Sequence, residues 1–220
     1  MTALHTLDAG PTDAARRLLL AHGAGAPMDS PFLESFVAML AERGIASTRF
    51  EFPYMAARRV SAKRKPPPKA EALVQDYAST VQTVRRRMSP EQRLFIGGKS
   101  MGGRVATQVA AADRQLAIDG LVLLGYPLHP PGKPDQLRDK HLPLVGRSML
   151  FVQGSRDGFG TPAELEPVLD KLTPRPLLHV IPGGDHSFKV PGRNSDVQNE
   201  VYAGVQRQIV VWMRSIVRER

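Results

Sequence analysis

The stretch LFIGGKSMGGRVA (residues 94–106) joins an apolar run to a segment of small, helix-forming residues through two pairs of glycines. An apolar run, a tight glycine turn and a helix occur in phosphate-binding loops and also in the turn that presents a catalytic nucleophile. The stretch alone leaves both interpretations open. Either one implies a strand followed directly by a helix, which is the repeating unit of α/β proteins.

A phosphate-binding loop needs a glycine five positions before its Gly-Lys-Ser, because the backbone curls around the anion before the helix begins. Counting back from Gly98, this position holds Arg93, and residues 94–96 between them are apolar and typical of a strand. The space needed for a phosphate cradle is therefore already occupied by the strand. The phosphate-loop interpretation is not favoured.

A nucleophile elbow has the pattern Gly-x-Ser-x-Gly, with glycines where side chains would collide in a sharp turn. Gly98-Lys99-Ser100-Met101-Gly102 matches this pattern. A serine before a helix can also be a simple N-cap, because serine favours that position in any case. The catalytic interpretation makes the stronger demand, since it requires an acid and then a histidine later in the chain.

Both partners occur in that order. SMLFVQGSRD (residues 148–157) places Asp157 a short turn after an apolar strand, and LLHVIPGGDH (residues 177–186) places His186 after the next one. Parallel sheets carry their sites at the C-terminal ends of their strands, so the three side chains are expected at one edge of the sheet. The sequence predicts a catalytic triad of Ser100, His186 and Asp157.

Asp185 is a second candidate for the acid because it precedes His186 directly. Adjacent residues seldom orient one another's side chains as a triad requires, and aspartate is common in turns. We therefore interpret Asp185 as a turn residue.

An acyl-transfer site also needs donors for the oxyanion of the tetrahedral intermediate. One is expected from the backbone N–H of Met101, and the other from Ala24 in the loop HGAGAP after the first buried strand. Gly23, Gly25 and Tyr126 are predicted to contact the substrate. The two loop glycines also resemble part of a dinucleotide-binding fingerprint, but its third glycine is missing.

Composition agrees with a small globular enzyme. The chain has 220 residues, 42% hydrophobic and 23% charged, which favours a single domain over residues 1–220. It has no cysteine, and its six histidines show no metal-ligand spacing, so we expect neither a cofactor nor a metal. The N-terminal residues do not resemble a secretory signal, and no apolar run could span a bilayer, so we expect a cytoplasmic location without a membrane partner.

Apolar runs alternate with segments of helical periodicity, which predicts an α/β fold with a mainly parallel central sheet, helices on both of its faces and no large cap domain. Residues 53–69 are expected to form a long loop, and residues 126–142 to cross the surface. Strands are expected at residues 17–21, 46–52, 93–96, 120–124, 147–153 and 177–181.

The formal charge of +9 raises the alternative of a catalytically silent binding module, built on the same fold, that holds an acidic partner or nucleic acid. Residues 58–69 are rich in arginine and lysine, but no aromatic residues that could stack on bases lie among them, so nucleic acid is not favoured. We interpret this basic segment as a solvated loop, and its cations also hint at a small, anionic or carboxylate-bearing acyl substrate. The oligomeric state cannot be inferred from the sequence.

The stretches LLLAHGAGAPMDSPF, GGKSMGGRVA, LLGYPLHPPGKP, LFVQGSRDGFG and GGDHSF resemble the α/β-hydrolase superfamily, most closely its small, cap-less branch related to dienelactone hydrolases. This resemblance implies a serine hydrolase that cleaves an ester or related acyl bond through the triad given above. Dienelactone hydrolases proper typically have a cysteine nucleophile, so Ser100 argues against that particular substrate.

Overall fold

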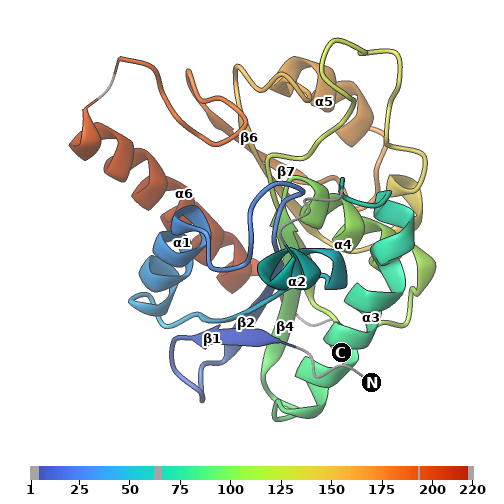
Figure 1. Cartoon of the computed structure of the whole chain (residues 1–220), viewed down its shortest axis with the longest axis vertical. Helices are drawn as coiled ribbons and strands as arrows, with labels where there is room; N and C mark the ends of the chain where they lie inside the picture. The colour runs from blue at the N-terminus through green and yellow to red at the C-terminus, as the bar shows by residue number, and fades with distance from the viewer. Residues whose placement is uncertain (1–4, 62–65, 193, 218–220) are drawn as a thin grey trace.

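The computed structural model describes residues 5–61, 66–192 and 194–217. Within them, seven strands form one sheet in the order β1-β3-β2-β4-β5-β6-β7 (Figure 1). Only the pair of β1 with β3 is antiparallel, and the others are parallel. The strands are β1 (Thr6–Ala9), β2 (Arg16–Ala21), β3 (Ala46–Phe50), β4 (Arg93–Lys99), β5 (Gly120–Leu124), β6 (Met149–Gly154) and β7 (Leu177–Ile181).

Helices cover both faces of the sheet (Figure 1). One hydrophobic core joins the sheet to α3, α4 and α5, and a second core joins it to α1 and α6. The prediction of a mainly parallel sheet between helices, without a large cap domain, is confirmed. The helices are α1 (Pro31–Ala41), α2 (Pro53–Val60), α3 (Val74–Arg86), α4 (Met101–Ala112), α5 (Pro162–Leu169) and α6 (Ser195–Ser215), with short 3₁₀ turns at Ala70–Leu73 and Leu142–Leu144.

The prediction of a continuous loop over residues 53–69 is wrong, because its first part is the helix α2. Pro53 occupies the first helical turn, where its fixed φ favours a helix and its missing N–H costs nothing. Met55 anchors the helix in the interior, and two arginines in its last turn complement the helix dipole. The basic residues 63–65 lie outside the described part of the chain.

The segment after β5 also departs from its prediction. Residues 126–129, the beginning of the expected surface crossing, are buried, whereas residues 131–137 are exposed. Backbone hydrogen bonds hold this beginning inside: His129 N–H donates to Phe159 O at 3.0 Å, and Arg138 N–H donates to Leu128 O at 2.7 Å. The segment therefore forms part of the wall around the C-terminal ends of β5 and β6.

Candidate active site

Ser100 stands in a strained turn between β4 and α4. Its backbone has φ 52° and ψ −117°, a conformation that side chains other than glycine rarely adopt. The turn presses against the end of β2, since a Cβ on Gly98 would lie 2.5 Å from Ala21 O and one on Gly102 would lie 2.6 Å from the same oxygen. The glycines of the elbow are thus required by close backbone approach, and they leave Ser100 at the C-terminal edge of the sheet.

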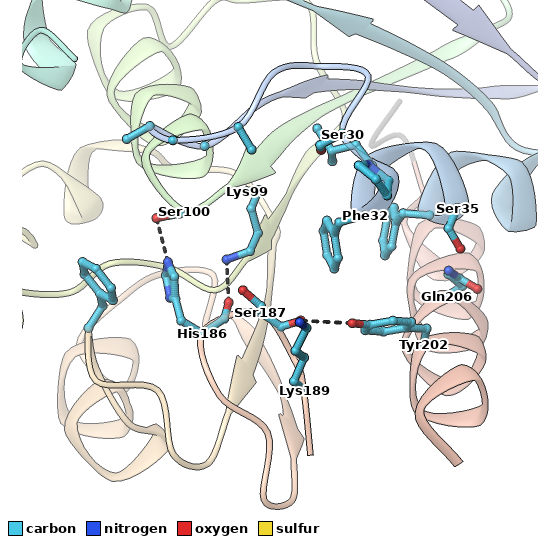
Figure 2. Close-up of a pocket in the computed structure, with 18 residues that line it drawn as sticks. Ser30, Phe32, Ser35, Lys99, Ser100, His186, Ser187, Lys189, Tyr202 and Gln206 are labelled. Carbon is cyan, nitrogen blue, oxygen red and sulfur yellow. Dashed lines mark hydrogen bonds between the residues drawn. The ribbon is translucent and has the colours of Figure 1, made fainter. Parts of the chain in front are cut away.

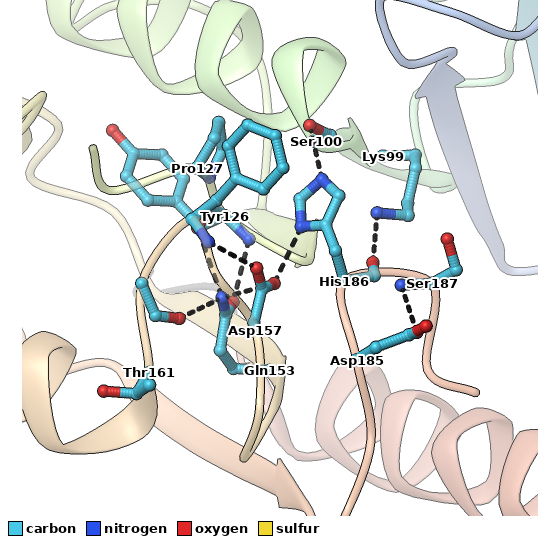
Figure 3. A network of polar contacts seen from close by, with 12 residues as sticks. Lys99, Ser100, Tyr126, Pro127, Gln153, Asp157, Thr161, Asp185, His186 and Ser187 are labelled. Atoms are coloured by element: carbon cyan, nitrogen blue, oxygen red, sulfur yellow. Dashed lines mark hydrogen bonds and ion pairs between the residues drawn. The ribbon is translucent and has the colours of Figure 1, made fainter. Parts of the chain in front are cut away.

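His186 lies between the other two predicted triad residues (Figure 3). Its Nε2 is 2.8 Å from Ser100 Oγ, and its Nδ1 is 2.8 Å from Asp157 Oδ2. A carboxylate can only accept, so Nδ1 carries the proton and Nε2 is free to accept from the serine hydroxyl. The Phe159 ring packs on the imidazole, with 4.3 Å between ring centroids. The structure therefore brings all three side chains into one hydrogen-bonded row.

The carboxylate of Asp157 is completely buried and held from two further sides. Its Oδ1 accepts from Phe159 N–H at 2.8 Å, and its Oδ2 accepts from Gln153 Nε2 at 2.8 Å. The Gln153 amide also donates to Gly160 O and, through its Oε1, accepts from Tyr126 N–H (Figure 3). Gln153 is a site residue that we did not predict from the sequence. The available signal was a polar residue near the end of the apolar strand β6.

Asp185 points elsewhere. Its Oδ1 accepts from the backbone N–H groups of Ser187 at 2.8 Å and Lys189 at 2.9 Å. These contacts are those of a turn residue, which agrees with our interpretation of its sequence position.

The loop after β2 is fixed beside the serine by His22. This imidazole is fully buried, with Nδ1 2.7 Å from Gly23 O and Nε2 accepting from Phe52 N–H at 3.1 Å. Burial lowers the pKa of His22, so the ring is neutral and donates through Nδ1. A Cβ built on Gly23 would lie 3.8 Å from Ser100 Cβ, which shows how closely this loop approaches Ser100.

The carbonyl of Ala24 accepts from Tyr54 Oη at 3.2 Å and from Arg58 Nη1 at 3.3 Å. These two bonds hold Ala24 in place from the α2 side, and Ala24 lines the space next to Ser100. Met101 begins α4, where backbone N–H groups of the first turn have no partner within the helix. Both residues predicted as oxyanion donors therefore border Ser100.

Lys99 is a further residue that sequence analysis did not assign to the site. Its Nζ donates to His186 O at 2.5 Å and lies 5.7 Å from the centre of the Phe188 ring. Burial lowers the pKa of Lys99 from 10.5 to about 8, against the opposing effect of the carboxylates Asp157 and Asp185. The amine thus ties the end of β4 to the loop that carries His186.

Two cavities meet at Ser100. The first, which we call the apolar cavity, has a volume of about 650 Å³ and lies between the serine, α1 and α6 (Figure 2). The second, which we call the arginine cavity, has a volume of about 720 Å³ and lies on the side of α4. Ala24, Ser100 and Phe159 line both. The apolar cavity is also bordered by Phe32, Phe36, Lys99, Tyr202 and Gln206.

Of the three residues predicted to contact the substrate, two line the apolar cavity and one lines neither cavity. Gly23 and Gly25 line the apolar cavity. Tyr126 lines neither cavity, is fully buried, and donates through its hydroxyl to Arg138 O at 2.7 Å. We correct its expected role: Tyr126 is not placed to contact a molecule in either cavity.

Two features are absent from the described residues. No group of three or more histidine, aspartate or glutamate side chains there is arranged to hold a metal ion. No helix in the same part of the chain has the length and apolarity needed to cross a bilayer.

The structure combines a strained serine elbow with an acid and a histidine that follow it at successive strand ends of a mainly parallel sheet. This combination defines the class of α/β hydrolases. Residues 14–214 match the family described as the alpha/beta hydrolase domain, and the chain belongs to that family.

Solved structures of this class have the same fold. Dienelactone hydrolase from Anabaena variabilis is 22% identical with a TM-score of 0.74, covering 98% of this chain and 93% of that one. A serine hydrolase without lid from Xanthomonas campestris is 21% identical with a TM-score of 0.63, covering 94% and 96%. The monoacylglycerol lipase of Paleococcus ferrophilus is 14% identical with a TM-score of 0.69, covering 96% and 99%.

Proposed function

We propose that the protein is a serine hydrolase that cleaves an ester or related acyl bond of a small substrate, acting as a single α/β-hydrolase domain. The observation that carries this proposal is the continuous row from Ser100 Oγ through His186 to Asp157, with both joining distances at 2.8 Å. An N-cap serine would not need an imidazole at this position. Membership of the hydrolase family supports the same conclusion.

In the proposed reaction, Ser100 Oγ attacks the acyl carbonyl while His186 Nε2 takes its proton. The carbonyl carbon becomes tetrahedral, and its oxygen takes up negative charge. Collapse of this intermediate expels the alcohol, which receives the proton from the imidazolium and leaves an acyl-enzyme. Water then repeats the sequence, with the imidazole first as base and then as acid, and releases the acid and the free serine.

Asp157 has a fixed part in this scheme. Its buried carboxylate keeps the proton on Nδ1 of His186 and stabilises the imidazolium when it forms. The bonds from Gln153 and Phe159 N–H hold the carboxylate in place, so little reorganisation is needed during the reaction.

The oxyanion would be held by the backbone N–H of Met101, which directly follows the nucleophile, and by the N–H of Ala24. Support comes from the position of both residues beside Ser100 and from the bonds that fix the Ala24 carbonyl. We place the acyl part of the substrate in the apolar cavity, because its walls include Phe32 and Phe36. The alcohol part would then leave through the arginine cavity.

Activity-based labelling tests the proposal. A fluorophosphonate probe is expected to label the wild type and to leave the Ser100→Ala variant unlabelled, and p-nitrophenyl esters of short acids should be hydrolysed only by the wild type. A folded wild type that neither reacts with the probe nor hydrolyses these esters would refute it.

The alternative of a silent binding module gains no support from Arg58 and Arg59, two of the basic residues on which it depends. Arg59 is paired with Glu51 and Asp29 at 2.6 and 2.7 Å, and Arg58 lies over the Tyr54 ring and donates to Ala24 O. These two arginines are engaged in holding α2 and the neighbouring loop, which argues against their serving as a surface for an acidic partner.

A further inference from the structure

The arginine cavity has an excess of positive charge next to the nucleophile. Among the described residues, its lining includes Lys69, Arg104 and Arg138 and a single acid, Glu71. The cavity reaches Ser100, so a group bound in it would lie on the opposite side of the serine from the apolar cavity. Charge of one sign inside a concave, partly desolvated site favours a ligand of the other sign.

Arg104 is only partly satisfied by protein groups. Its Nη2 is paired with Glu71 Oε1, and the same oxygen accepts from Gln108 Nε2 at 3.0 Å. Its Nε is buried and has no hydrogen-bond partner among the described residues. One carboxylate oxygen therefore serves two donors, while a charged N–H of the guanidinium is left without an acceptor, which is costly in a buried position.

Arg138 lies across the same cavity. Its Nη1 has a long contact of 3.4 Å with the carbonyl of Pro127. Burial and, next, the positive charge of Arg104 lower the pKa of Arg138. Two guanidinium groups thus face one space and repel one another, an arrangement that an anion between them would relieve.

We propose that the arginine cavity binds an anionic oxygen group, a carboxylate or a phosphate, on the alcohol side of the substrate through Arg104 and Arg138. The guanidinium fork matches the spacing of both kinds of oxyanion. This inference rests on the proposed function for the orientation of the substrate, but the binding of the anion itself does not require catalysis. The substrate class is then an ester whose leaving alcohol carries a negative charge.

Matched acetate esters test the preference. The substrates are 3-acetoxybenzoate, its neutral analogue 3-acetoxybenzamide and 3-acetoxyphenyl phosphate, which share an acyl group and differ in the charge of the leaving phenol. We expect the wild type to favour an anionic ester over the amide by about 10-fold or more in kcat/KM, the equivalent of one charged hydrogen bond. Whether carboxylate or phosphate gives the larger ratio identifies the natural group.

Substitutions assign the preference to the cavity. Arg138→Gln should reduce the ratio to near one, and Arg138→Lys, which keeps the charge but loses the fork, should give an intermediate value. Arg207→Gln is the matched control, because it removes one charge from an exposed arginine of α6 that pairs with Glu200. Equal ratios in the wild type and Arg138→Gln, or a wild-type ratio near one, would overturn the proposal. The wild-type ratio should also fall in about 0.5 M salt.

A binding measurement separates this proposal from that of catalysis. In the Ser100→Ala background, 3-hydroxybenzoate or 3-hydroxyphenyl phosphate should bind more tightly than 3-hydroxybenzamide, and Arg138→Gln should abolish the difference. If the protein binds the anionic phenols selectively but the fluorophosphonate probe does not label the wild type, the proposal of a serine hydrolase is refuted and that of the anion site stands. If the probe labels Ser100 but binding is not selective, only the proposal of the anion site is refuted.

Discussion

At the scale of single residues, Asp157 and Asp185 provide a direct comparison. We predict that Asp157→Asn lowers kcat by about 10⁴-fold, the order expected when the acid of such a triad becomes an amide. The amide nitrogen can turn toward His186 Nδ1, which would shift the proton to Nε2 and remove the acceptor for Ser100. Steady-state hydrolysis of a p-nitrophenyl ester measures the loss.

Asp185→Asn is the matched control, because its amide oxygen can still accept from Ser187 and Lys189 N–H in the turn. We expect its kcat to stay within a few-fold of the wild type, since these bonds only shape the loop. If Asp185→Asn were the more damaging change, the acid role would belong to Asp185.

Lys99 links the site to the pH dependence of stability. Its pKa is about 8 in the native protein against 10.5 in the unfolded chain, so between these values the unfolded chain binds a proton that the native protein has released. The free energy of unfolding therefore rises with pH between about 8 and 10.5, and this added stability is lost as the pH falls through 8. We predict that from pH 8 to 10 the wild type gains stability relative to Lys99→Met, by up to about 1 kcal/mol per pH unit.

Urea denaturation at several pH values measures this difference, and parallel profiles of the two proteins would contradict it. The series should stop near pH 10, because burial raises the pKa of Tyr54 to about 12. Above pH 10 the unfolded chain releases tyrosine protons that the native protein retains, which lowers stability in both proteins.

At the scale of elements, the turn between β4 and α4 depends on contact between backbones. A Cβ on Gly102 would lie 2.6 Å from both Ala21 O and His22 O, at the point where β2 leads into the loop that contains Ala24. We predict that Gly102→Ala lowers the free energy of unfolding by about 1–3 kcal/mol, as overpacking does. It should also lower kcat, because α4 can only relieve the clash by moving Ser100 or the loop.

Gly204→Ala is the matched control in another helix. A Cβ there meets only the end of the flexible Arg207 side chain at 3.7 Å, and α6 should gain up to about 1 kcal/mol from the better helix former. Calorimetry and ester hydrolysis on both variants compare the two positions. A Gly102→Ala variant as stable and active as the wild type would show that the elbow is looser than this geometry implies.

The elements that the sequence predicted correctly are those with a strong apolar pattern. Strands such as β4 and β5 are buried on both faces, and they therefore read as uninterrupted apolar runs. β1 is a four-residue edge strand, TLDA, and pairs through its backbone with β3, so its side chains carry little signal. α2 was missed because its arginines and neighbouring prolines outweighed the single buried anchor Met55.

The same distinction holds within the candidate site. Ser100, Asp157 and His186 could be placed because chain order and strand ends suffice to locate them. Gln153 could not be assigned, because its role arises from contacts with Asp157 and residues brought together by folding. Arg104 and Arg138 face one cavity although 34 positions separate them, and no local pattern relates them.

At the scale of the whole molecule, the sheet separates two hydrophobic cores, and only the core on the side of α1 and α6 continues into the apolar cavity. Gln206 of α6 lies where this core meets the apolar cavity (Figure 2). It is fully buried, and neither its Nε2 nor its Oε1 has a partner among the described residues. Such an amide destabilises the native state, since unfolding returns both of its groups to water.

We predict that Gln206→Leu, which keeps the size and removes the amide, raises the free energy of unfolding by about 1–3 kcal/mol. Gln198→Leu in the same helix is the matched control, because its amide donates to Phe188 O at 2.8 Å and accepts from Val190 N–H at 2.9 Å. That variant should be less stable than the wild type, since it leaves two backbone groups unpaired. Urea unfolding of both variants measures the difference in their free energies of unfolding.

A loss of stability in Gln206→Leu comparable to that in Gln198→Leu would contradict this prediction. It would mean that the Gln206 amide is hydrogen-bonded in solution, with water in the apolar cavity as its partner.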